Sequence, residues 1–267
     1  MKPSLPIAAP SEASPKVRPT LAGVWAGLVF LLLTLLAFGL VLLTPGKLNR
    51  SALARRVARI FLKLAGIDLQ LEQLERLPAG ACVVVANHAS YLDGVVMKAA
   101  LPARFSFVIK KEILHVPVAG LFLRLIGSEF VDRFNRHSGA IDTRRLLRAA
   151  SQGQSLGFFP EGTIPSQVGI AQFHTGAFVI AVRAGLPVVP VAICGTRAAL
   201  PLGSIWLKPG KITVSVLPTV DPEGGKSQAA AVILRDTARQ AVLSAVREPD
   251  LAADAERAVT QPRRATS

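Results

Sequence analysis

The sequence predicts an α/β fold with a mainly parallel sheet flanked by helices, preceded by an N-terminal transmembrane helix. From about residue 67, short apolar runs alternate with longer amphipathic segments, and several short runs are rich in β-branched residues. Such alternation is typical of a parallel sheet that helices cover on both faces. The uncharged, apolar stretch 21–44 predicts the membrane helix.

Residues 1–20 are rich in Pro, Ser and Ala, which predicts a disordered tail. As a helix, 21–44 would be about 36 Å long against a hydrocarbon core of about 30 Å, so it is predicted to span a membrane with some tilt. A helix that enters only one leaflet is an alternative. A cleaved signal peptide fits less well, because Lys47 and Arg50 precede the only A-x-A-like site, Ala52-Leu53-Ala54.

Residues 45–66 are predicted to form a basic amphipathic helix at the membrane interface. Apolar side chains recur along one face from Leu53 to Leu64, and basic side chains lie on the other face or at its rim. A surface helix packed on the domain fits the same periodicity. Lys and Arg are more frequent after the apolar segment than before it, which places the main domain on the cytoplasmic side.

Residues 67–247 are predicted to form one domain, followed by a flexible, polar and Ala-rich tail at 248–267. Pro190 is unusual for a central strand and indicates an edge, a bulge or the wall of a site. The expected strands are 82–86, 105–109, 129–131, 156–159, 188–193 and 212–217. The expected helices are 91–100, 117–126, 138–150, 173–184 and 228–247.

The stretch from Asn87 to Asp93 follows the buried strand 82–86. In open α/β sheets, ligands bind beyond the carboxyl ends of the strands, which is where this stretch lies. If a helix begins near Ser90, Asp93 lies in its first turn and can fold back to the imidazole of His88. A histidine held by a carboxylate is a general base near neutral pH. The alternative is that Ser90 and Asp93 form only a helix capping box.

A second candidate segment, Phe159-Pro160-Glu161-Gly162-Thr163, comes at the end of the run 156–159. Glycine permits positive φ or a close approach of the backbone. A surface Pro-Glu-Gly turn is the alternative. Its position at the end of a buried strand favours a functional role, and the two segments together predict one site.

Four blocks resemble the signature blocks of the glycerolipid acyltransferases, the family that includes the 1-acyl-glycerol-3-phosphate acyltransferases. They occur in the family's order, and the resemblance covers roughly residues 67–220. The blocks are Asn87-His88-x-Ser90-x-x-Asp93, Gly127 to Arg133, Phe159 to Thr163, and Val189 to Ile193.

The resemblance implies a role for each block. His88 and Asp93 would be catalytic, and Arg133 would bind the phosphate of a substrate. Glu161 and Gly162 would line the polar substrate site. The other substrate-binding residues that the resemblance implies are Asn87, Ser90, Thr163 and Pro190, the last as a residue that shapes the acyl or acceptor pocket.

The chain departs from the family pattern directly after Thr163. The family usually has Arg and Ser there, whereas this chain has Ile164 and Pro165, so a phosphate-binding cation is missing at that place. His174 also stands near a position where relatives often carry a lysine. An acceptor with another head group, such as a lyso-ornithine lipid or a lysophospholipid, therefore competes with 1-acyl-glycerol-3-phosphate.

The chemistry can also be argued from the residues. Acyl transfer from a thioester to a hydroxyl needs a base and donors for the developing oxyanion. The sequence has no G-x-S-x-G elbow, and Cys82 and Cys194 lie in apolar runs, which predicts buried thiols that are neither nucleophiles nor metal ligands. We therefore expect direct attack by the acceptor hydroxyl, with His88 as the base and Asp93 on its other ring nitrogen.

The sequence thus predicts a membrane-anchored acyltransferase without a metal or cofactor. Its donor would be acyl-CoA or acyl carrier protein, and its lysolipid acceptor 1-acyl-sn-glycerol-3-phosphate, giving phosphatidate. A catalytically silent lipid-binding protein is one alternative. The net charge of +14 alone would fit a nucleic-acid-binding protein. No nucleic acid is expected, because the one Tyr and two Trp do not alternate with the basic runs.

Overall fold

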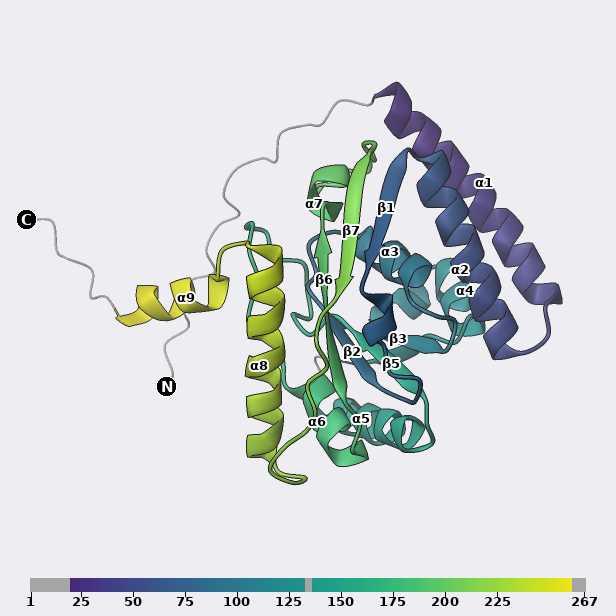
Figure 1. Cartoon of the computed structure of the whole chain (residues 1–267). Coiled ribbons are helices and arrows are strands. Elements are labelled where there is room, and N and C mark those ends of the chain that lie inside the picture. Colours follow the sequence, from purple (N-terminus) through teal and green to yellow (C-terminus); the bar gives the residue numbers. More distant parts are fainter. Residues whose placement is uncertain (1–19, 133–135, 261–267) are drawn as a thin grey trace, which may run out of the picture.

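A computed structural model describes residues 20–132 and 136–260 of the chain. In this part of the chain, one seven-stranded sheet has the order β1-β7-β6-β2-β5-β3-β4 (Figure 1). All neighbouring strands are parallel except β6 and β7, which confirms the mainly parallel sheet. The strands are β1 (Ile67–Glu72), β2 (Val83–Ala86), β3 (Phe105–Lys110), β4 (Glu129–Val131), β5 (Ser155–Phe158), β6 (Val188–Cys194) and β7 (Gly210–Val216).

The edge strand β1 was not expected from the sequence. Its residues alternate between apolar and polar, and only Ile67 is buried. It pairs in parallel with β7 from Ile67 opposite Gly210 to Glu72 opposite Ser215. An edge strand with one solvated face carries a weaker apolar signal than a buried strand such as β2, in which every residue is buried.

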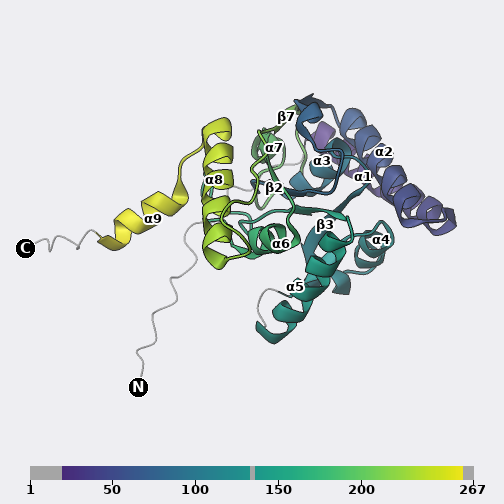
Figure 2. The ribbon, with the colours of Figure 1, turned by 60° about the horizontal axis from the view of Figure 1, so that its bottom comes forward.

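Helices cover both faces of the sheet, as Figures 1 and 2 show. Val84 of β2 packs in one core with α2 and α3, and its neighbours Val83 and Val85 pack in another with α6 and α8. The α-helices are α1 (Leu21–Leu43), α2 (Lys47–Leu64), α3 (Asp93–Ala100), α4 (Ala119–Leu125), α5 (Arg136–Ser151), α6 (Gly176–Ala184), α7 (Thr196–Ala199), α8 (Gln228–Val246) and α9 (Leu251–Thr260). The short 3₁₀ helices are η1 (Leu74–Arg76) and η2 (Lys111–His115).

Helix α1 is long and apolar enough to cross a membrane, judged by its length and composition. It lies along α2 rather than apart from the domain (Figure 1). The indole N–H of Trp25 donates to the carbonyl oxygen of Leu64 over 3.0 Å, and the rings of Phe30 and Phe61 meet edge to face with centroids 5.1 Å apart. Most of the remaining surface of α1 is exposed leucine, valine and phenylalanine.

Helix α2 packs its small and apolar face against α3, with Ala54, Ala58 and Leu62 buried. Two of its basic side chains turn to the domain. Arg59 donates through Nε to the carbonyl oxygen of Ala99, over 2.8 Å, and Arg55 donates through Nη2 to that of Ala100. These carbonyls end α3, where cations are favourable. Helix α2 is therefore packed on the surface of the domain, and its place at a membrane interface stays a prediction.

Pro190 lies in β6, which is a central strand between β7 and β2, so an edge, one of the three alternatives for this proline, is excluded. The N–H of Leu217 donates to the carbonyl oxygen of Pro190. Proline has no N–H for the reciprocal bond, and the β6–β7 ladder begins at the next residue, Val191. The end of the ladder therefore accommodates the proline.

The C-terminal segment differs from the flexible tail expected at 248–267, because its described part contains α9. Asp250 precedes this helix, and its side chain accepts hydrogen bonds from the backbone N–H groups of Ala252 and Ala253. Asp250 also forms an ion pair with Arg239 of α8. Helix α9 thus begins at an aspartate cap that is itself attached to the domain.

Candidate active site

His88 and Asp93 lie together at the carboxyl end of β2. The Nδ1 atom of His88 is 2.8 Å from Oδ2 of Asp93. Asp93 is the first residue of α3 and is fully buried, whereas a fifth of the His88 side chain is exposed. Because a carboxylate only accepts hydrogen bonds, this contact assigns the proton to Nδ1. The other nitrogen, Nε2, is then the one that can accept a proton.

Asp93 is both a cap of the first turn of α3 and a partner of the His88 imidazole. Its Oδ2 atom accepts hydrogen bonds from the backbone N–H groups of Ala89 and Ser90, over 2.7 and 2.8 Å, in addition to the contact with His88. Asp93 is therefore a cap for the turn and a partner of the imidazole at once. The helix begins three residues later than Ser90, with Leu92 at the N-cap position.

Asn87 and Ser90 hold the histidine loop to the neighbouring chain. The side-chain amide of Asn87 donates to the carbonyl oxygen of Ile193 and accepts from its N–H, over 2.9 and 2.8 Å. The hydroxyl of Ser90 donates to the carbonyl oxygen of Leu200 over 2.7 Å. Both side chains are buried, so these contacts fix the loop against β6 and α7.

Glu161 connects the two predicted segments. Its Oε1 accepts a hydrogen bond from the backbone N–H of His88 over 2.7 Å, and its Oε2 accepts one from the N–H of Ala171 over 2.9 Å. Burial raises the pKa of this carboxyl to about 7, although the two hydrogen bonds favour the charged form. Both oxygens are thus engaged by the backbone, and Glu161 positions the histidine loop.

A cavity of about 380 Å³ lies beside this loop. Phe159 lines it and stacks on the imidazole of His88, with ring centroids 4.3 Å apart. One part of the wall is apolar and is formed by residues of β3, β4, β5, α5 and α6. The polar part includes Asp132, Thr143 and His174, together with the backbone of Pro160 and Gly162. The cavity therefore offers an apolar wall and polar groups beside the ring of Phe159 that stacks on the partly exposed imidazole of His88.

The remaining predicted residues are spread over different places. Gly162 lines the cavity and has a φ of +78°, which favours glycine. Thr163 is exposed, and Pro190 is buried within β6; neither lines the cavity. Arg133 lies outside the described residues.

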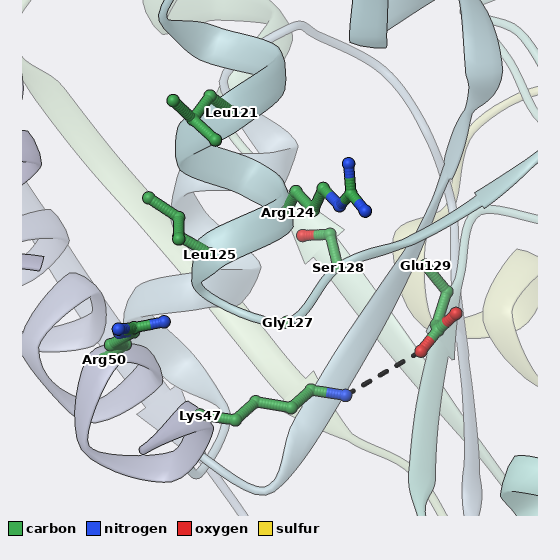
Figure 3. Close-up of a pocket in the computed structure, with 8 residues that line it drawn as sticks. All are labelled: Lys47, Arg50, Leu121, Arg124, Leu125, Gly127, Ser128 and Glu129. Carbon is green, nitrogen blue, oxygen red and sulfur yellow. Dashed lines mark ion pairs between the residues drawn. The ribbon is translucent and has the colours of Figure 1, made fainter. Parts of the chain in front are cut away.

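A larger hollow of about 520 Å³ lies elsewhere, between the start of α2 and the turn from α4 to β4 (Figure 3). Lys47 reaches across it to Glu129, with 3.7 Å between Nζ and the carboxylate. Arg50 and Arg124 also line it. None of the residues around His88 contributes to its wall, so this hollow is separate from the candidate active site.

Two features of the site carried no signal in the sequence. The ring of Phe159 was part of a recognised segment, but its stacking on His88 depends on the pairing of β2 with β5. Arg197 of α7 was not singled out, although it donates to the carbonyl oxygen of Pro165 over 3.3 Å. The described residues contain no group of three or more His, Cys, Asp or Glu side chains placed to hold a metal.

Comparisons with known proteins agree on one family. Residues 68–194, which include both candidate segments, match the family model described as Acyltransferase. The chain is 34% identical to a 1-acyl-sn-glycerol-3-phosphate acyltransferase of Chlamydomonas reinhardtii, over 67% of this chain and 52% of that one. It is 31% identical to the human 1-acyl-sn-glycerol-3-phosphate acyltransferase beta, over 69% and 66% of the two chains.

Several curated relatives, including the one from Chlamydomonas reinhardtii, are longer proteins. The chain spans about half or less of their length. Among solved structures, the fold resembles the 1-acyl-sn-glycerophosphate acyltransferase PlsC of Thermotoga maritima. The TM-score is 0.69 at 22% identity, over 84% of this chain and 95% of that one. This likeness supports the fold.

Proposed function

Because the chain belongs to the acyltransferase family, we propose that it transfers a fatty acyl group to the free hydroxyl of 1-acyl-sn-glycerol-3-phosphate and so forms phosphatidate. The donor would be a thioester, acyl-CoA or acyl carrier protein. The observation that carries the proposal is the contact of 2.8 Å between His88 and Asp93, beside a cavity with an apolar wall.

In the proposed reaction, Nε2 of His88 removes the proton of the acceptor hydroxyl as its oxygen attacks the thioester carbonyl. The negative charge moves to the carbonyl oxygen, and Asp93 stabilises the imidazolium through Nδ1. When the tetrahedral intermediate collapses, the carbon–sulfur bond breaks and the ester forms. The departing thiolate takes the proton from Nε2, which restores the base and completes the proton balance.

The walls of the cavity suit the two parts of a lipid substrate. The apolar wall from β3, β4, α5 and α6 suits a fatty acyl chain, because burying a methylene is worth about 0.8 kcal/mol. Asp132, Thr143 and His174 offer hydrogen-bonding groups for the polar part.

Helix α1 is proposed as the membrane anchor. Its exposed apolar side chains suit lipid, and its packing along α2 supports an anchor that lies beside the domain. The charge pattern of the sequence supports a domain on the cytoplasmic side. Such an anchor would hold the site where both the acceptor and the product reside.

The decisive experiment measures acyl transfer by purified protein in detergent, with a labelled acyl donor and 1-acyl-sn-glycerol-3-phosphate. His88→Ala should lower the initial rate by about 10²–10⁴-fold, because the positioned base is lost. Asp93→Asn should also lower it strongly, because an amide can donate to Nδ1 and so leave Nε2 protonated. His115→Ala, which changes an exposed histidine of η2, is the control and should retain the rate.

Near-normal rates in folded His88→Ala protein would exclude the mechanism. Absence of transfer by the wild type to any lysolipid would exclude the function. A second candidate is transfer to a lysolipid without a terminal phosphate, which Ile164 favours because it places an aliphatic side chain where the family usually has a cation. Rates with lyso-ornithine lipid and lysophospholipid acceptors, measured in the same assay, distinguish the two candidates.

A further inference from the structure

Arg197 carries a charge that the described structure leaves largely unpartnered. Its Nη1 donates to the carbonyl oxygen of Pro165 at a long distance of 3.3 Å. Its Nε and Nη2 atoms are buried and have no hydrogen-bond partner among the described residues. A guanidinium keeps its charge in proteins, and a buried charge without a partner costs free energy. Such an arrangement calls for an anion.

The surroundings of Arg197 place it beside the candidate active site. It lies between Ile193 and Leu200, whose backbones bind Asn87 and Ser90 of the histidine loop. From the other side, the chain that contains Pro165 follows Glu161, which accepts the N–H of His88. The guanidinium is therefore enclosed by the two segments that form the site.

The strand that precedes Arg197 and the strands that line the cavity lie on opposite sides of β2 in the sheet. The order of the strands places β2, which carries His88, between β6 and β5. The strands that line the cavity are β5, β3 and β4, with α5 and α6 beside them, whereas Arg197 lies in α7 after β6. A donor chain in the cavity and a head group at Arg197 would thus meet at the imidazole from two sides.

We propose that the guanidinium of Arg197 binds the phosphate of the acceptor's head group. This inference rests on the proposed function. A planar guanidinium suits phosphate, because it can donate two parallel hydrogen bonds. Ile164, which precedes Pro165 in the sequence, supplies no charge, so Arg197 would provide the cation from another element. The hydroxyl of Thr196, the preceding residue of α7, is also buried without a partner in the described chain.

The segment 163–168 has to move for this binding. It covers Arg197, and the hydrogen bond to Pro165 is the one that the structure shows between them. Residues 166–168 are exposed, so few contacts hold the outer part of the segment. The phosphate would replace the carbonyl oxygen of Pro165 as the partner of Nη1 and would also engage Nη2.

Glu248 is the competing partner. Its carboxylate contributes to the raised pKa of both Glu161 and Cys194, so it lies in the same region. Its Oε2 is buried without a partner, and no ion pair joins it to Arg197 in the described part of the chain. If Arg197 served only to balance this acid, its loss would change stability and not the recognition of the acceptor.

The test compares acceptors with and without a phosphate. Full-length wild type and Arg197→Gln, which keeps a donor for Pro165 but loses the charge, are assayed with 1-acyl-sn-glycerol-3-phosphate and with monoacylglycerol. The variant should raise KM for the phosphate-bearing acceptor about tenfold to hundredfold. KM for the acyl donor and the rate with monoacylglycerol should stay unchanged. Arg197→Lys should give an intermediate KM, and Arg183→Ala, on the exposed end of α6, should match the wild type.

Three results would overturn the inference while the wild type remains active. They are an unchanged KM for the phosphate-bearing acceptor, an equal loss with both acceptors, and a raised KM for acyl-CoA instead, which would assign Arg197 to the donor's phosphates. If Glu248→Gln restored the thermal unfolding midpoint of Arg197→Gln without any effect on KM, the role would be structural. A wild type that is inactive with every lysolipid would instead reject the proposed function.

Discussion

A single carboxylate oxygen of Asp93 organises the histidine loop at the scale of residues. It accepts three hydrogen bonds, from the imidazole of His88 and from the backbone N–H groups of Ala89 and Ser90. Because all three donors converge on Oδ2, the imidazole, the turn and the start of α3 are fixed by one group. A change at Asp93 should therefore alter both the tautomer of the His88 imidazole and the shape of the loop.

Glu161 makes stability depend on pH. Burial raises its pKa from 4.5 to about 7, so the folded state binds the proton more tightly than the unfolded state. Its contribution to stability is fully present below pH 4.5 and is lost as the pH rises through 7. The difference corresponds to about 3 kcal/mol at most. We expect the thermal unfolding midpoint of the wild type to fall between pH 5 and pH 7.5.

Glu161→Gln is the matched variant for this prediction, because it cannot titrate. The amide NH₂ group of the glutamine would face the N–H of either His88 or Ala171, so one backbone donor would lose its acceptor. This loss should lower the free energy of unfolding by about 1–3 kcal/mol at pH 5. The midpoint of the variant should start lower and should change less between pH 5 and pH 7.5. An identical pH profile for the two proteins would contradict the role of this carboxyl.

At the scale of elements, the end of α3 and the middle of α2 support each other. The last carbonyls of α3 have no partner within the helix, and Arg55 and Arg59 of α2 donate to two of them. Ser51 of α2 also donates to the carbonyl oxygen of Ala103 over 2.6 Å. Helix α3, which begins at Asp93, is thus held at its other end by α2.

We predict that Arg59→Ala lowers stability by about 1 kcal/mol, because it removes a charged donor from the end of α3. Arg56→Ala is the matched control: Arg56 is exposed, no contact of its side chain is described, and its removal should change stability by less than about 0.5 kcal/mol. Thermal unfolding of both variants in the same detergent measures the difference. Equal midpoints for the two variants would show that the contact with Ala99 contributes nothing.

At the scale of the whole molecule, the chain combines an α/β domain with a pair of helices along one side, the apolar α1 and the basic, amphipathic α2. Helix α1 buries small residues such as Ala26 and Ala37 and exposes most of its leucines. An exposed leucine surface of this length is unusual for a soluble domain and suits a lipid environment. Ala86, the last residue of β2 before the histidine loop, packs in the same hydrophobic core as residues of α1 and α2.

We predict that the double change Leu32→Glu and Leu36→Glu releases the protein from membranes. These leucines are 65% and 57% exposed, and moving a charged side chain into the hydrocarbon costs about 3 kcal/mol each. Leu32→Ala with Leu36→Ala is the control and should remain in the membrane fraction. Flotation of both variants with phospholipid vesicles measures the effect. A double glutamate variant that floats like the wild type would contradict the assignment of α1 as an anchor.

The sequence determined the features that depend on near neighbours in the chain. The β-branched run before Asn87 was sufficient to predict β2, and the spacing of five residues was sufficient to bring Asp93 to His88. The apolar composition of α1 was equally visible. The apolar run 188–193 was also sufficient to predict β6. It did not predict that β6 is a central strand, because proline is normally excluded from such a strand.

Only the tertiary structure decided which distant groups meet at the histidine. Glu161 binds the backbone of His88 across 73 positions, and Asn87 binds Ile193 across 106, because β2 lies between β5 and β6 in the sheet. Periodicity reports which residues are buried but not which strands are neighbours. For the same reason, the sequence did not single out Arg197. Its unpartnered nitrogens are recognised only in the tertiary structure, which brings Arg197 to the segment after Glu161.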